Sequence, residues 1–251
     1  MSESLPEIGL IVVGDEILSG RRVDRHVAAA IERLAARGLA LTWARYEGDD
    51  EGRLAGVLRE TMATEALVFC CGGIGATPDD VTRQAAAAAS DRRLLHHPEG
   101  CEILRERFDD HLTEHRLRMV EFPEGAVLIP NPVNRIPGFQ LEHHCFVPGF
   151  PRMAWPMLEW VLDVRYPQLT REPPVSRAVR VRAREGDLIA MLERLGAEHP
   201  AARFSSLPEM RDRGYVVELG VSGPAEAVEP AFAALEAALE RAGIGPSEEG
   251  E

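Results

Sequence analysis

The chain of 251 residues contains no lysine, so its 28 basic residues are all arginines. A phosphate-binding loop of the Walker type depends on a lysine that reaches the β- and γ-phosphates. Enzymes that form a Schiff base depend on a lysine amine as the nucleophile. The missing lysine excludes both classes, and a bias toward arginine codons in a GC-rich genome is the simplest explanation for it.

Positive charge is scarce as well, since 28 arginines are set against 41 aspartates and glutamates and leave a formal net charge of −13. A surface of that sign repels nucleic-acid backbones and anionic lipid headgroups. We therefore expect neither a nucleic acid nor a membrane as the main partner.

One local group of arginines departs from this acidic balance. Its members are Arg177, Arg180, Arg182 and Arg184. They could form an RNA-binding face, but a solvated strand face is favoured, because the chain is acidic and no aromatic residues are interleaved with them.

Cysteine is rare, and the four that occur show neither CxxC pairing nor zinc-ligand spacing. They are Cys70, Cys71, Cys101 and Cys145. No apolar run approaches the roughly eighteen residues that a membrane-spanning helix needs. The short apolar run near the N-terminus also lacks the basic flank of a signal peptide. The sequence therefore predicts a cytoplasmic protein without a disulfide framework.

Strand and helix patterns alternate along the first 90 residues. The predicted strands cover 8–13, 39–46 and 66–71, and the predicted helices cover 23–37, 49–62 and a third that begins with residues 79–90. Continuous apolar strands that alternate with amphipathic helices are typical of a parallel sheet covered on both faces. We expect a three-layer α/β/α domain with a mostly parallel sheet over residues 1–170, completed by helices at 97–119 and 151–166.

The proline-rich stretch 166–175 ends this pattern and is the best candidate for a linker. Beyond it, strict alternation at 177–183 predicts a strand. A helix capped by Asp187, strands at 202–206 and 214–221 and a helix at 225–242 then complete a βαββα pattern. We expect a small α+β domain over residues 174–245, followed by a disordered tail at 246–251.

Three loops that combine glycine with acidic residues follow the predicted strands of the first domain. They are GDEILSG (14–20), EGDDEG (47–52) and GGIGATPDD (72–80). Ligands of doubly wound sheets bind beyond the carboxyl ends of the parallel strands, so these loops are expected to meet. Glycine lets backbone N–H groups approach an oxyanion closely, and the following helix N-terminus adds partial positive charge. Such a loop can bind phosphate without lysine.

Carboxylates beside a phosphate-binding loop repel the phosphate unless a cation offsets their charge. Mg²⁺ is commonly held by one or two carboxylates together with phosphate oxygens of the substrate. Asp79 and Asp80 therefore suggest metal-assisted phosphoryl or nucleotidyl transfer. By pattern alone, capping of the next helix is the more common role of such aspartates. Three acidic glycine loops at equivalent strand ends are a stronger signal than any one of them.

Four linked motifs make the resemblance to a known family specific. VGDEILSGRRVD, GDDEGRL, GGIGATPDDVTRQAAA and PNPVNRIPGF…CFVPGFPRMAWPML resemble, in order and spacing, the molybdopterin-binding domain of molybdenum-cofactor biosynthesis proteins over roughly residues 6–166. They are most similar to the competence/damage-inducible protein A subfamily, and the βαββα unit resembles the domain that follows there. That subfamily often carries a further C-terminal nicotinamide-nucleotide amidase domain, which is not expected within these 251 residues.

This resemblance implies a molybdopterin- or nucleotide-binding protein that acts at a phosphate anhydride with Mg²⁺ or another divalent cation. One branch of the family adenylylates molybdopterin with ATP, and the other is associated with hydrolysis of ADP-ribose-like pyrophosphates. The alternative is a pterin- or nucleotide-binding module without turnover, a carrier or sensor whose second domain mediates assembly. Related domains commonly form dimers or trimers, so we expect a homo-oligomer.

The resemblance also implies roles for individual residues. Asp50 and Asp80 match the acidic residues associated with catalysis, and both are expected to hold the metal. The implied substrate-binding positions are Gly14, Asp15, Glu16, Ser19, Gly20, Gly72, Gly73, Gly75, Thr77, Asp79, Thr82, Pro148 and Gly149, with Pro151 in the same late loop. Two departures from the subfamily are Ala76, in place of a proline, and Arg25-His26, in place of Thr-Asn near the first helix.

Two histidine pairs stand out in the sequence, and the first has the spacing of a metal site. HLTEH (111–115) matches the pattern of inverted zinc proteases, and its two histidines would share one face of the predicted helix 97–119. His115 also belongs to that helix's apolar stripe, so a position beside the core is favoured over zinc binding. The adjacent His143 and His144 are expected in a loop or at a sheet edge.

Overall fold

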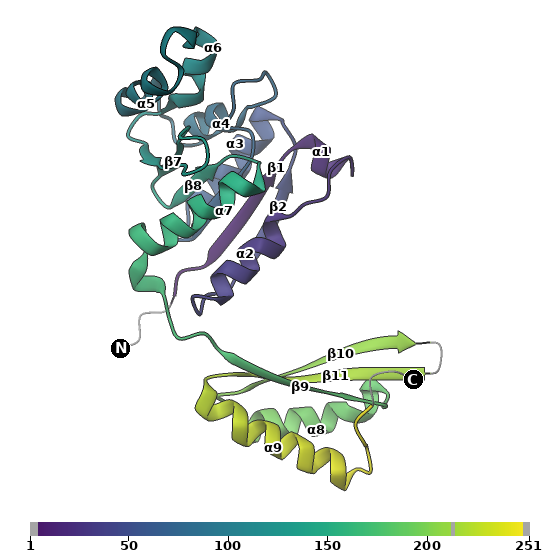
Figure 1. Ribbon diagram of the computed structural model, residues 1–251. Coiled ribbons are helices and arrows are strands. Elements are labelled where there is room, and N and C mark those ends of the chain that lie inside the picture. The colour runs from purple at the N-terminus through teal and green to yellow at the C-terminus, as the bar shows by residue number, and fades with distance from the viewer. Residues whose placement is uncertain (1–4, 212–213, 248–251) are drawn as a thin grey trace. The chain divides into compact units, whose positions relative to one another are not determined.

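The computed structural model describes residues 5–211 and 214–247 (Figure 1). The chain divides into two compact units, Met1–Arg171 and Glu172–Glu251. No helix within the described ranges is long and apolar enough to cross a membrane.

Over its described residues, 5–171, the first unit contains eight strands and seven α-helices. The strands are β1 (Ile8–Val13), β2 (Trp43–Glu47), β3 (Leu67–Cys71), β4 (Leu94–His96), β5 (Glu121–Pro123), β6 (Val127–Ile129), β7 (Gly138–Leu141) and β8 (His144–Val147). The helices are α1 (Asp15–Leu18), α2 (His26–Ala35), α3 (Glu51–Met62), α4 (Thr82–Ala89), α5 (Pro98–Phe108), α6 (Glu114–Leu117) and α7 (Pro151–Trp160). Short helical turns are η1 (Asp109–His111), η2 (Arg118–Val120), η3 (Val161–Arg165) and η4 (Pro167–Leu169).

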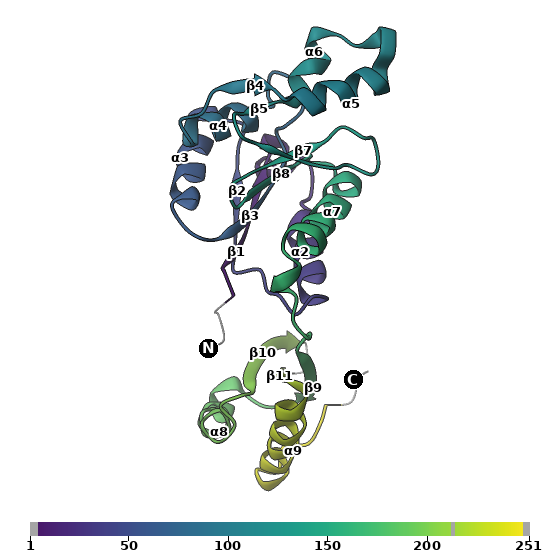
Figure 2. The ribbon, with the colours of Figure 1, turned by 90° about the vertical axis from the view of Figure 1, so that its left-hand side faces the viewer.

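Six of the strands form the central sheet, in the order β2-β1-β3-β8-β7-β6. β2, β1, β3 and β8 are parallel, and β7 and β6 are antiparallel to their neighbours. Figure 2 shows α2 and α7 on one side of this sheet and α3 and α4 on the other. The predicted three-layer α/β fold with a mostly parallel sheet is therefore confirmed.

Two apolar clusters cover the two faces of the sheet. Because successive side chains of a strand point to opposite faces, β1 sends Leu10 and Val12 toward α2 and α7 and sends Ile11 and Val13 toward α3 and α4. All four side chains are buried. Burial on both faces explains why this strand is apolar at every position except Gly9.

The predicted helix at 97–119 is wrong. α5 ends at Phe108, because Asp109 adopts a left-handed conformation with φ of 44° and a short η1 turn follows. His111 lies in η1 and His115 lies in α6, so the two histidines do not share one helix face. Within the described ranges, no three His, Cys, Asp or Glu side chains gather in a group that could hold a metal ion.

The expectation for His144 is also wrong, because it begins the interior strand β8 and is buried. Its Nε2 lies 2.8 Å from the Thr61 hydroxyl, and its Nδ1 has no hydrogen-bond partner in the described part of the chain. Burial lowers the pKa of His144 to about 4, from an ordinary value of 6.5.

We expect acid to destabilise the first unit through His144. The unfolded chain takes up a proton at this histidine near pH 6.5 and the folded chain only near pH 4, so its contribution is complete above pH 6.5 and falls between these values. The loss is about 3 kcal/mol by pH 4. Urea unfolding followed by tryptophan fluorescence reports this unit, because all three tryptophans lie in it. A His144→Gln variant that keeps the same decline over this pH range would contradict the assignment.

The described part of the second unit has a three-stranded antiparallel sheet in the order β10-β11-β9 and two helices. Its elements are β9 (Val175–Val181), α8 (Glu185–Glu198), β10 (Arg203–Arg211), β11 (Gly214–Gly223) and α9 (Ala225–Arg241). Asp187 was predicted to cap this helix, but that prediction is wrong. α8 begins at Glu185, and Asp187 lies in its first turn. Arg177 pairs with Glu229 at 2.9 Å, and Arg180 pairs with Glu218 at 3.0 Å.

The start of the predicted disordered tail is ordered. Pro246 forms a β-bridge with Val181, and the backbone N–H of Ser247 donates to the carbonyl oxygen of Arg180 at 2.7 Å. That part of the prediction is wrong. The remaining positions of the predicted tail, 248–251, lie outside the described residues.

Candidate functional site

The carboxyl ends of β1, β2, β3 and β8 open onto one pocket of about 430 Å³. Segments far apart in the sequence line it, because parallel strands deliver their following loops to the same edge of a sheet. They are Gly14, Glu16 and Arg22 after β1, Asp49 after β2, residues 72–77 with 79 and 80 after β3, and residues 148–150 after β8. Residues 72–80 form the glycine loop.

The glycine loop has a backbone path that only glycine can follow at its start. Gly72 and Gly73 have φ of 115° and 67°, in the region that favours glycine. A Cβ atom on Gly72 would lie 2.3 Å from the carbonyl oxygen of Val13, and one on Gly73 would lie 2.2 Å from Oγ1 of Thr82. The loop can therefore lie directly against β1 and the start of α4.

Four consecutive backbone N–H groups of this loop, those of residues 73–76, make no hydrogen bond to any other described residue. All four residues line the pocket. Buried or half-buried backbone N–H groups normally find a partner, so these unpaired donors make the loop a candidate for binding an oxyanion.

Side chains of α4 hold the glycine loop from behind. The Thr82 hydroxyl donates to the carbonyl oxygen of Gly72 at 2.9 Å, and the Thr82 N–H donates to that of Gly73 at 2.9 Å. Thr82 is fully buried and does not line the pocket. It supports the loop from outside the cavity.

Arg83 fixes the middle of the same loop although it is only 2% exposed. Its Nη2 donates to the carbonyl oxygen of Gly75 at 2.7 Å, and its Nη1 donates to the carbonyl oxygen of Arg118. Burial lowers the pKa of the Arg83 guanidinium. Arg83 therefore connects η2 to the glycine loop through these two hydrogen bonds.

The first two acidic loops are bonded to each other. The Asp15 N–H donates to Oδ2 of Asp49 at 2.9 Å, and the Asp49 N–H donates to Oδ1 of Asp15 at 3.3 Å. Burial raises the pKa of Asp49, and the nearby charges of Asp15, Glu16 and Asp79 raise it further. The pocket thus concentrates negative charge around Asp49.

The two predicted catalytic aspartates have different surroundings. Asp50 does not line the pocket; its Oδ1 accepts the N–H of Arg53 at 2.7 Å and caps α3. Asp80 lines the pocket, and its Oδ2 accepts both the Thr77 N–H, at 2.8 Å, and the Thr77 hydroxyl. Asp80 therefore braces the glycine loop, and no side chain caps α4.

The structure brings most of the predicted site residues to this pocket. Those that line it are Gly14, Glu16, Gly72, Gly73, Gly75, Thr77, Asp79, Asp80, Pro148 and Gly149. Those that do not are Asp15, Ser19, Gly20, Asp50 and Thr82. The roles in catalysis and binding remain predictions for both groups.

Several lining residues were missed by sequence reasoning. They include Arg22, Asp49 and an apolar wall of Ile74, Met119, Ile136, Phe150 and Met153. Asp49 is adjacent to the predicted Asp50 in the same motif. The motif therefore indicated the right loop, but the prediction chose the neighbouring aspartate. Arg22 is the one cationic side chain among the lining residues, and its Nη1 lies 3.6 Å from Oε1 of Glu16.

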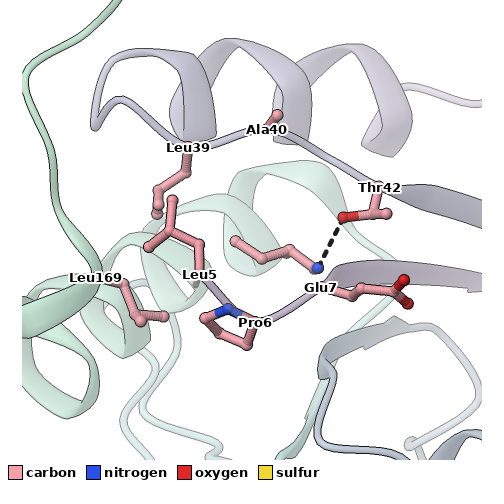
Figure 3. Close-up of a pocket in the computed structure, with 8 residues that line it drawn as sticks. Leu5, Pro6, Glu7, Leu39, Ala40, Thr42 and Leu169 are labelled. Carbon is pink, nitrogen blue, oxygen red and sulfur yellow. Dashed lines mark hydrogen bonds between the residues drawn. The ribbon is translucent and has the colours of Figure 1, made fainter. Parts of the chain in front are cut away.

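A second cavity, of about 300 Å³, lies at the amino end of β1 and contains none of the predicted site residues. Figure 3 shows the side chains of Leu5, Leu39 and Leu169 converging there, while the Glu7 carboxylate points away from them. The Ile8 N–H donates to the Thr42 hydroxyl oxygen at 3.0 Å beside it. This lining offers no cluster of polar groups for chemistry.

The part of the chain that forms this pocket matches a known protein family. A family model described as a probable molybdopterin binding domain matches residues 9–171, which include every loop that lines it. The chain belongs to this molybdopterin-binding family. Membership confirms the resemblance found in the four sequence motifs and supports a pterin-binding domain.

Relatives of this chain include CinA-like proteins. One from Geobacter metallireducens is 39% identical over 157 residues, which are 60% of this chain and 38% of that protein. A protein of Pyrobaculum calidifontis is 29% identical over 250 residues, which are 94% of each chain. The chain therefore spans well under half of the first relative and nearly all of the second.

A solved structure agrees with the molybdopterin-binding fold. The crystal structure of CinA from Thermoplasma acidophilum, a protein described as having unknown function, is 25% identical with a TM-score of 0.58. The match covers 66% of this chain and 99% of that one. The likeness concerns the fold and assigns no reaction.

Proposed function

We propose that the pocket binds a phosphate-bearing pterin or adenine nucleotide and acts, with a divalent cation, at a phosphate anhydride of that ligand. The observation that carries this proposal is the placement of four unpaired backbone N–H groups and the carboxylates of Glu16, Asp49, Asp79 and Asp80 in one cavity. The N–H groups suit the anion, and the carboxylates suit the cation that offsets its charge.

The two walls of the pocket fit the two ends of such a ligand. The glycine loop would hold the phosphate, while Met119, Ile136 and Met153 form apolar surface suited to a flat heterocycle. Arg22 at the side of Glu16 would contact a second phosphate, because its guanidinium is the positive charge that the lining supplies.

The carboxylates fit a magnesium ion that is shared with the substrate better than an all-protein cage. No group of three potential ligand residues forms within the described ranges, whereas Mg²⁺ often uses one or two carboxylates plus phosphate oxygens. When bound, the cation would neutralise charge on the transferring phosphoryl group. We assign Asp49 and Asp80 to hold it, since Asp50 serves as the cap of α3.

The two reactions that the family resemblance implies share this arrangement. In adenylyl transfer, a phosphate of molybdopterin attacks the α-phosphorus of ATP and pyrophosphate leaves. In hydrolysis, water attacks the anhydride of an ADP-ribose-type substrate, and AMP is released with ribose phosphate. Both need an anhydride held between donors and a cation, and both are predicted to involve the glycine loop.

A binding module without turnover is the second candidate. The observation in its favour is the departure from the subfamily at Arg25-His26, near the first helix. In that case the pocket would keep a pterin or nucleotide bound and release it unchanged. Homo-oligomer formation, with the second unit mediating assembly, stays a prediction for either candidate.

One experiment separates the two candidates. AMP or pyrophosphate release is measured with ADP-ribose, with FAD and with ATP plus molybdopterin, each with and without Mg²⁺ or Mn²⁺. Metal-dependent release from one substrate supports the enzyme. Tight binding of one ligand without turnover under any metal supports the binding module, and the absence of both would reject the proposed function.

Asp80→Asn is expected to lower metal-dependent turnover about 100-fold or more while the fold stays intact. The asparagine Oδ1 can still accept the Thr77 N–H, so the glycine loop keeps its brace, but the charge that attracts the cation is lost. Turnover is compared with the urea midpoint of the same preparation. Full activity in the variant would remove Asp80 from the mechanism.

A further inference from the structure

His26, the first residue of α2, lies beneath the loop that joins β8 to α7 and is only 5% exposed. Its Nε2 lies 3.1 Å from the carbonyl oxygen of Gly149. Because a carbonyl oxygen only accepts, Nε2 carries the hydrogen and donates it. Burial lowers the pKa of His26, so the ring is neutral near pH 7 and its Nδ1 is unprotonated. Nδ1 has no partner among the described residues.

The start of α2 holds this ring in place from the backbone side. Oδ1 of Asp24 accepts the His26 N–H at 2.8 Å, and Oδ2 of Asp24 accepts the Val27 N–H at 3.2 Å. The Tyr46 hydroxyl of β2 also donates to Oδ2 of Asp24, at 3.0 Å. His26 is therefore fixed to the helix and, through Asp24, to the sheet.

The residue that His26 contacts packs directly on the glycine loop. A Cβ atom on Gly149 would lie 3.2 Å from Cα of Gly72, so the two backbones touch with no side chain between them. The Gly72 N–H donates to the carbonyl oxygen of Val147 at 3.0 Å. Both Gly149 and Gly72 line the pocket, whereas His26 does not.

We propose that His26 is a positioning residue. The hydrogen bond from its Nε2–H to Gly149 holds the loop 148–150 against the glycine loop and thereby sets the width of the pocket. His26 acts only through Gly149, since it does not reach the cavity. The part of this inference that concerns ligand affinity rests on the function proposed above; the order of the loop does not.

The test compares His26→Leu with His26→Gln in the ligand-free full chain. Glutamine can place an N–H donor near the position of Nε2, whereas leucine fills similar space without a donor. Amide hydrogen exchange of a peptide over residues 146–154 is expected to accelerate about tenfold in His26→Leu and to stay at the wild-type rate in His26→Gln. Exchange in a peptide from α3 should be unchanged in both variants.

Three results would overturn the positioning role. They are wild-type exchange in His26→Leu, equally fast exchange in both variants, and acceleration that spreads evenly to α3, which marks a merely structural residue. The rescue by glutamine is the readout that general loss of packing does not reproduce.

A second measurement addresses the pocket itself, with ADP-ribose and Mg²⁺ as the probe in calorimetry. Affinity is expected to fall about tenfold in His26→Leu and to stay unchanged in His26→Gln. Equal affinity of His26→Leu and wild type would show that the loop does not set the pocket's width. If wild type binds no ADP-ribose, the proposed function loses support for this substrate, and the exchange experiment still decides the role of His26.

Discussion

Asp49→Asn is expected to lower metal-dependent AMP release about 100-fold or more, whereas Asp50→Asn, one residue further on, should leave it within about twofold of wild type. The two carboxylates differ in what they face. Asp49 lines the pocket near Glu16 and Asp79, and Asp50 accepts the Arg53 N–H at the start of α3. Asparagine keeps the shape of either side chain and removes only its charge.

Substitutions at Asp49 and at Asp50 should also have different effects on the free energy of unfolding. The folded-state pKa of Asp49 is raised, so its ionised form is disfavoured in the native protein, and its contribution to stability declines as pH rises through that pKa. Asp49→Asn removes this repulsion and is expected to raise stability at pH 7. Asparagine is as good an N-cap as aspartate, so Asp50→Asn should be neutral, while Asp50→Ala should cost about 1 kcal/mol through loss of the cap.

Activity assays and urea unfolding of the three variants test this assignment together. Loss of turnover in Asp50→Asn, with Asp49→Asn fully active, would return the catalytic role to the residue expected from the sequence. Loss of turnover in neither would show that no carboxylate of this loop takes part.

The sequence was sufficient for the position of the pocket but not for the orientation of its side chains. Apolar strand runs followed by glycine-containing loops predicted where β1, β2 and β3 end, and parallel topology then brings the loops together. Nothing in the pair Asp49-Asp50 shows which side chain turns to the pocket. That choice depends on the helix start, where Asp50 satisfies the Arg53 N–H and Asp49 bonds to Asp15.

Local sequence patterns also could not predict the apolar wall of the pocket or the break in the helix expected at 97–119. Met119, Ile136 and Met153 reach the pocket from three distant segments, and none belongs to a motif with a chemical signature. The helix predicted at 97–119 has a continuous apolar stripe, but the left-handed Asp109 interrupts it. His144 lies in an interior strand because β8 pairs with β7 as well as with β3. The polar pair His143-His144 does not suggest such a position.

Arg83→Met is expected to produce the largest loss of stability, about 3 kcal/mol or more in the first unit. Methionine fills much of the volume but cannot donate to the carbonyl oxygens of Gly75 and Arg118. Each hydrogen bond to a charged donor that is lost costs about 1.5–3 kcal/mol. The glycine loop should also lose its anchor at Gly75, so the affinity for a phosphate-bearing ligand should fall along with stability.

Arg59→Met is the matched control for this change. Arg59 is exposed on α3, and its Nη2 donates to a single carbonyl oxygen, that of Ala88, at 2.9 Å. Its replacement should alter stability by no more than about 0.5 kcal/mol. Urea unfolding followed by tryptophan fluorescence measures both variants in the unit that contains all three tryptophans. Arg83 donates hydrogen bonds to both the glycine loop and η2, and in the described part of the chain Arg59 donates to neither. Equal stability losses in the two variants would therefore mean that the buried guanidinium does not hold these two segments together.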